Sequence, residues 1–163
     1  MSGVPSIKRK LAVLLIGIIA VSACTDKKEE SNIEQEPKSS FNAELATKLG
    51  ADEYGMRQYV MAFLKAGPNR DQGEEEAQTI QLAHRANISR LADEGKLSVA
   101  GPFMDDGEIR GIFIFNVTTI EEAKALTESD PAIKAGRLVM ELHPWYGSAA
   151  LMQVNETHKT LSK

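Results

Sequence analysis

The chain has 163 residues, which suits one ordinary domain, and it carries a formal net charge of −4 at pH 7 with a pI near 5.5. That acidic balance argues against a nucleic-acid-binding protein, because such a protein needs a basic surface to neutralise phosphates. The single cysteine, Cys24, excludes an internal disulfide bond.

The first element along the chain is typical of a secretory signal peptide. Three basic residues at 8–10 precede an apolar run at 11–20, which is about half of the roughly 20 residues that span a bilayer. Small residues then lead directly to Cys24, so the segment 1–23 resembles the signal of bacterial lipoproteins. The resemblance predicts a lipid on the Cys24 sulfur and an anchor to a bacterial membrane, on the periplasmic or cell-surface side of the envelope. A transmembrane anchor with a chance cysteine is the alternative.

Residues 24–55 are predicted to form a lipidated tether that ends in a short helix. The part at 25–40 is charged and polar, and with Ile33 as its one apolar side chain it cannot form a core. A helical pattern follows and stops at Gly50. That pattern is carried by Phe41, Leu45 and Leu49.

The folded domain is expected to span residues 56–146, and a C-terminal tail at 147–163 follows it. The tail is ambiguous, with a last helix as one interpretation. Short apolar runs bounded by glycine, proline or polar residues are typical of buried strands. Such runs predict four strands, at residues 59–64, 97–100, 109–117 and 137–146.

Three helical segments are predicted between these strands. Residues 74–94 contain no proline and place apolar side chains on one face. Thr118 and Glu121 have the spacing of a capping box, which begins the second helix. Asp130 caps a short third segment, in which a proline takes the first helical position. The order β-α-β-β-α-β predicts an α+β, ferredoxin-like fold with helices on one face of an antiparallel sheet.

The third predicted strand indicates a partner. In residues 109–115 both alternating faces are apolar through the middle of the strand. One face packs on the helices, whereas the other would be exposed in a monomer, and a large exposed apolar sheet face usually marks an interface. We therefore expect two sheets to pack together in a two-fold homodimer.

His84 is the most informative side chain for chemistry. It lies four residues from both Ile80 and Ile88, on the helix stripe that is expected to face the sheet. This position fits a partly buried imidazole that performs general acid–base chemistry, and it also fits a core histidine with a satisfied hydrogen bond. Asp130 is the candidate partner, because a capping carboxylate stays ionised and can orient an imidazole. An aspartate before Pro131 is also what a helix start requires.

Several short motifs around these residues occur in a fixed order along the chain. They are His84-Arg85-Ala86-Asn87-Ile88-Ser89-Arg90-Leu91, Asp93-Glu94-Gly95-Lys96-Leu97, Ala100-Gly101-Pro102-Phe103, Glu121-Glu122-Ala123, Ser129-Asp130-Pro131-Ala132 and Ala135-Gly136. Taken together, they resemble the YciI-like (YCII-related) family over roughly residues 56–145.

The resemblance implies a ferredoxin-like domain of the dimeric α+β barrel type, with a paired histidine and aspartate in a pocket. His84 and Asp130 match that pair, and Gly101 and Pro102 would help to shape the pocket rim. At least one family member is a dehydrochlorinase, and the fold is similar to that of muconolactone isomerase. The resemblance therefore predicts a lyase or isomerase reaction, without a cofactor, on a small organic acid. The lipoprotein signal, tether and tail are departures from the small cytoplasmic members.

Other patterns are weaker. The three histidines, His84, His143 and His158, lack the spacing of metal ligands, and no phosphate or dinucleotide loop is present, so no metal or cofactor is expected. Arg110 and Arg137 suit either an anionic substrate or simple solvation. Two functions stay open: an acid–base enzyme, and a non-catalytic binding or structural lipoprotein that uses the fold as a dimerising scaffold. An open, polar-lined cavity at His84 would favour the enzyme, and a filled core would favour the scaffold.

Overall fold

The computed structural model describes residues 40–161 and 163. The predicted signal peptide, the predicted lipidation site Cys24 and the tether up to residue 39 lie outside the described residues. Within the described part, none of the helices combines the length and the apolar character that crossing a membrane requires.

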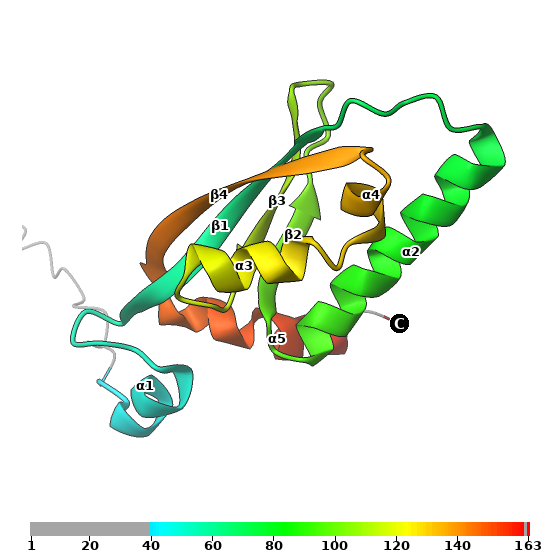
Figure 1. Cartoon of the computed structure of the whole chain (residues 1–163). Coiled ribbons are helices and arrows are strands. Elements are labelled where there is room, and N and C mark those ends of the chain that lie inside the picture. The colour runs from blue at the N-terminus through cyan, green and yellow to red at the C-terminus, as the bar shows by residue number, and fades with distance from the viewer. Residues whose placement is uncertain (1–39, 162) are drawn as a thin grey trace, which may run out of the picture. The chain divides into compact units, whose positions relative to one another are not determined.

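The described chain forms one antiparallel sheet with helices packed on it (Figure 1). The sheet order is β2-β3-β1-β4, so the first and third strands lie in the centre. The antiparallel pairing and this order confirm the expected α+β, ferredoxin-like fold. The strands are β1 (Met56–Ala66), β2 (Leu97–Pro102), β3 (Ile109–Phe115) and β4 (Leu138–Ser148).

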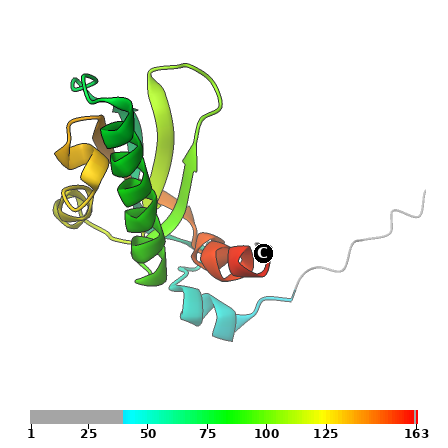
Figure 2. The same cartoon turned by 90° about the vertical axis from the view of Figure 1, so that its right-hand side faces the viewer.

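The long helix α2 and the shorter helices α3 and α4 lie on one side of the sheet, whereas α5 lies near one end on the other side (Figure 2). The tail therefore contributes a 3-10 turn and a last helix. The helical elements are α1 (Ala43–Leu49), α2 (Glu74–Asp93), α3 (Ile120–Thr127), α4 (Pro131–Lys134), η1 (Ala149–Gln153) and α5 (Val154–Leu161).

The hydrophobic core lies between the sheet and helices α2 and α3. Alternate residues of β1, at Val60, Ala62 and Leu64, are buried toward the helices, and Phe113 and Phe115 of β3 lie on the same face. This alternation is the period of two expected of a strand with one face against a core. The core is completed by Leu91, Leu97, Val117 and Ala123.

The opposite face of the sheet is partly covered by the chain's own C-terminal segment. Ser98 Oγ donates to Met152 Sδ of η1, and Asn155 Nδ2 of α5 donates to the backbone oxygen of Leu97. Part of the cover that the sequence analysis assigned to a second subunit therefore comes from the tail. Half-buried apolar side chains remain on this face, at Met61, Phe63, Ile112 and Trp145.

The predicted start of α3 needs a correction. The N-cap is Thr119 rather than Thr118: the Glu122 backbone N–H donates to Thr119 Oγ1, and the Thr119 hydroxyl donates to the Glu122 carboxylate. Two adjacent threonines followed by two glutamates give the capping-box spacing twice, so local sequence cannot choose between them. The frame that begins at Thr119 buries Ala123 against the sheet, and packing therefore selects it.

Candidate active site

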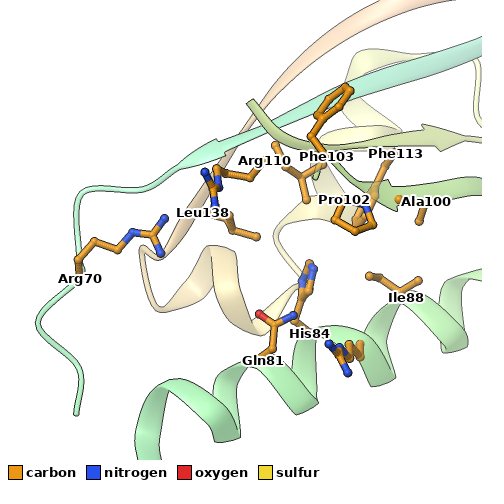
Figure 3. A pocket seen from close by; sticks show the side chains of 14 residues that line it. Arg70, Gln81, His84, Ile88, Ala100, Pro102, Phe103, Arg110, Phe113 and Leu138 are labelled. Atoms are coloured by element: carbon orange, nitrogen blue, oxygen red, sulfur yellow. The ribbon is translucent and has the colours of Figure 1, made fainter. Parts of the chain in front are cut away.

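Helix α2 presents four side chains to a cavity between the helix and the sheet. Gln81, His84, Arg85 and Ile88 line it, and their spacing places them on one face of the helix (Figure 3). The cavity has a volume of about 430 Å³, which is within the range of sites for small organic molecules. The core around His84 is therefore not filled by protein side chains.

The opposite wall of the cavity comes from β2 and β3. Gly101 and Pro102, the predicted rim residues, line this wall together with Gly111 and Phe113. A Cβ at Gly111 would lie 2.6 Å from the Gly101 carbonyl oxygen, so only glycine permits the close approach of the two strands here.

Asp130 meets His84 from the start of α4. His84 Nδ1 lies 2.9 Å from Asp130 Oδ1 and 2.8 Å from Oδ2, and both side chains are buried. The imidazole also stacks on the Phe113 ring, with centroids 6.0 Å apart and an interplanar angle of 14°. Because Nδ1 is engaged by the carboxylate, Nε2 is the ring nitrogen left for the cavity.

The surroundings of Asp130 keep its carboxyl ionised. Burial alone would raise its pKa, but the hydrogen bond and charge of His84 and the donors from Ala132 N–H and Asn87 hold that pKa below its ordinary value. The Ala132 N–H lies 2.8 Å from Oδ1 as part of the α4 cap. An ionised carboxylate can only accept, so Nδ1 carries a hydrogen, and in the neutral form of this tautomer the lone pair lies on Nε2.

Asn87 is a further component of this site, and the sequence analysis missed it. Its Nδ2 donates to Asp130 Oδ2 at 3.2 Å, while its Oδ1 accepts from Arg90 Nη2 at 2.8 Å. Ser129 Oγ also donates to Asn87 Oδ1, at 3.3 Å. The Arg90 donor fixes the amide so that its NH₂ group faces the carboxylate. The spacing of three residues from His84 along α2 is the signal that could have found it.

The other sequence candidates lie in different places. His143 lies on the far face of the sheet with Glu141, and His158 lies on α5. Arg110 lines the cavity, whereas Arg137 donates from Nη1 to Gln72 Oε1 at 2.7 Å and does not line it. No group of three histidine, cysteine or acidic side chains suited to a metal ion occurs among the described residues.

The YCII-related domain family matches residues 60–146, which is more than half of the chain. The chain belongs to the YCII-related domain family. Both His84 and Asp130 lie within the residues that match the YCII-related domain.

A solved structure similar to the domain is 5-chloro-2-hydroxyhydroquinone dehydrochlorinase from Burkholderia phenoliruptrix AC1100, in complex with 2,5-dihydroxybenzoquinone. It has 20% sequence identity and a TM-score of 0.41, and the match covers 53% of this chain and 92% of that chain. The comparison with curated proteins found no match.

Proposed function

We propose that this YCII-related protein is a cofactor-independent lyase or isomerase that moves a proton on a small organic molecule. The observation that supports the proposal is the buried His84–Asp130 pair beside a cavity of about 430 Å³. A core histidine would be surrounded by packed side chains, whereas this imidazole has space for a ligand at its second nitrogen.

The reaction begins with His84 Nε2 as the general base. Nε2 takes a proton from a substrate carbon, and the electron pair of that C–H bond shifts into the substrate. The imidazolium then returns the proton to another carbon, giving an isomer, or to a departing group, giving elimination. The ionised Asp130 stabilises the imidazolium and keeps the ring oriented through Nδ1. General acid–base catalysis of this kind contributes roughly 10²- to 10⁴-fold to a rate.

Hydrogen exchange tests the proposal before the substrate is known. The protein is incubated in D₂O with a panel of small organic acids that have activated C–H bonds, and mass spectrometry measures deuterium incorporation. We expect exchange with the native protein and none with His84→Gln, while His143→Gln, a histidine outside the cavity, exchanges normally. Exchange that persists in His84→Gln would contradict the assignment of the base. Absence of exchange throughout the panel with folded native protein would favour the scaffold function.

We also propose that the protein is a homodimer. The half-buried apolar side chains on the second sheet face, such as Phe63 and Ile112, support contact with a second copy. Residues 40–163 contain the whole described fold, and we expect light scattering to give the mass of a dimer without detergent. A stable monomer at micromolar concentration would contradict the sheet-to-sheet contact.

A lipid anchor on Cys24 is the remaining part of the proposed function. It is supported by the basic start, the short apolar run and the small residues that precede Cys24. We expect mass spectrometry of the native protein to find an acylated Cys24 as the first residue. An intact Met1 or a free Cys24 thiol would contradict this proposal.

A further inference from the structure

Three arginines from three separate elements line the cavity at His84. Arg70 lies in the loop between β1 and α2, Arg85 on α2, and Arg110 on β3. No aspartate or glutamate is among the residues that line the cavity. In a chain with a net charge of −4, this is a local concentration of positive charge around one hollow.

These three guanidinium groups make almost no hydrogen bonds within the described protein, unlike other arginines of the fold. Among the described residues, Arg70 and Arg85 make no side-chain hydrogen bond or ion pair, and Arg110 only donates to the backbone oxygen of Gly107 at 3.2 Å. By contrast, Arg90 Nη1 donates to Glu94 Oε1 at 2.7 Å, and Arg137 donates to Gln72. Like charges around one cavity repel each other, so an anion would relieve the repulsion and could replace water as the acceptor for these exposed guanidinium groups.

The two ends of the cavity also differ in chemistry. In Figure 3, Arg70 and Arg110 lie on the left, Ile88 and Ala100 lie on the right, and the His84 ring rises between them. A ligand with an anionic group at one end and an apolar body at the other would match both ends at once. Its central carbon would then lie beside the imidazole.

We propose that Arg70 and Arg110 bind an oxyanion group of the substrate, a carboxylate or a phosphate, and that the substrate's apolar body contacts Ile88. This inference rests on the proposed function, because it places the substrate's C–H bond at His84. The arginines then have a second effect. When His84 Nε2 removes the proton, the negative charge left on the substrate develops near these cations, which lowers the barrier to proton transfer.

Calorimetric titration of the purified protein tests the assignment with three probes of similar size: benzoate, phenyl phosphate and neutral benzamide. We expect at least one of the anions to bind roughly tenfold or more tightly than benzamide. The tighter anion identifies the headgroup as carboxylate or phosphate. Arg70→Gln and Arg110→Gln should each weaken its binding by roughly tenfold and leave benzamide unchanged.

Two further variants separate this inference from the proposed reaction. Lys48→Gln removes one positive charge from α1, outside the cavity, and should bind the anion like the native protein. His84→Gln should retain anion binding even though it loses hydrogen exchange. If the native protein catalyses no C–H exchange but still binds the anion through its arginines, the proposed proton transfer is refuted and the anion site is not. Binding of benzamide as tight as both anions, no anion binding, or variants of Arg70 and Arg110 that bind normally would overturn this assignment.

Discussion

Two histidine–carboxylate pairs of equal length lie on opposite faces of the sheet. His84 Nδ1 lies 2.8 Å from Asp130 Oδ2, with side chains 8% and 1% exposed, whereas His143 Nε2 lies 2.8 Å from Glu141 Oε1, with side chains 47% and 48% exposed. The distance therefore does not distinguish them, and the surroundings do. Water and salt screen the outer pair, while the inner pair is desolvated, surrounded by donors and open to a cavity.

Removing the inner carboxylate should have the largest effect on stability. Asp130→Ala deletes the cap of α4 and leaves His84 and Asn87 without their acceptor, so we expect a loss of about 3–5 kcal/mol in the free energy of unfolding. Urea denaturation measures this loss. Glu141→Ala is the matched change on the outer face and should leave the midpoint almost unchanged. Similar losses in both variants would show that burial does not separate the two pairs.

A double-mutant cycle sharpens the comparison by isolating each pair from its other contacts. His84→Ala also removes the stacking on Phe113, and the cycle with Asp130→Ala cancels that contribution. We expect a coupling free energy of about 2 kcal/mol for the inner pair. The same cycle on His143 and Glu141 should give no measurable coupling, and coupling of equal size there would contradict the comparison.

Asn87 should contribute less than Asp130 because it supplies only one donor to the carboxylate. Asn87→Ala is expected to lower the free energy of unfolding by about 1–2 kcal/mol, because the buried Asp130 Oδ2 loses one hydrogen-bond donor. It should also slow the deuterium exchange that the protein catalyses on a substrate C–H bond, without changing the protein's affinity for the anionic probe. Ser89→Ala, an exposed change on the same helix, is the control and should alter neither quantity.

The pH dependence should show the smallest of the four effects. The folded pKa of Asp130 lies below its ordinary value of 3.8, so the ionised group stabilises the fold above about pH 4, and this contribution is lost as the pH falls through the folded pKa. The stability difference between native protein and Asp130→Asn should therefore shrink as the pH falls below about 4. Urea unfolding at constant ionic strength measures it.

The outer carboxylate provides the control for this titration. Hydrogen bonds from Lys65 and His143 also hold the pKa of Glu141 below its ordinary value, so its effect has the same sign. Because Glu141 is exposed, Glu141→Gln should change the pH dependence less, and added salt should remove the change. A larger slope change for Glu141→Gln than for Asp130→Asn would reverse the interpretation of the two faces.

Sequence patterns were sufficient to predict the fold and to identify both members of the inner pair, His84 and Asp130. The period of three to four residues in α2 places His84 on the buried stripe, and an aspartate before Pro131 marks the start of α4. Both signals are local, so they can be recognised without knowledge of tertiary contacts. The repeated threonine–glutamate spacing shows the limit of such signals, because only packing against the sheet decides which frame begins the helix.

The rest of the site depends on contacts between distant parts of the chain. Asn87 is defined by partners on the segment that joins α3 to α4, and Arg70 lies in a polar loop that carries no periodic signal. Gln81 and Asn87 could still have been found from their spacing of three residues from His84, and Arg85 from its spacing of four residues from Gln81. The cover that the tail gives to the second sheet face depends on tertiary packing in the same way, since a short amphipathic segment has no local mark of where it docks.

The cap at Asp130 also bears on how this domain can change during evolution. Helix α4 has four residues, too few for a helix to persist without outside support, and its first backbone donors end on the Asp130 carboxylate. Selection for a stable fold therefore retains this aspartate whether or not any reaction takes place, whereas the imidazole at position 84 holds no helix end. In a lineage that abandoned catalysis, Asp130 keeps its role in the cap, whereas His84 keeps only its contacts with Asp130 and Phe113, so position 84 has fewer reasons to be retained. Among relatives of this chain, the histidine rather than the aspartate is the informative marker of retained chemistry.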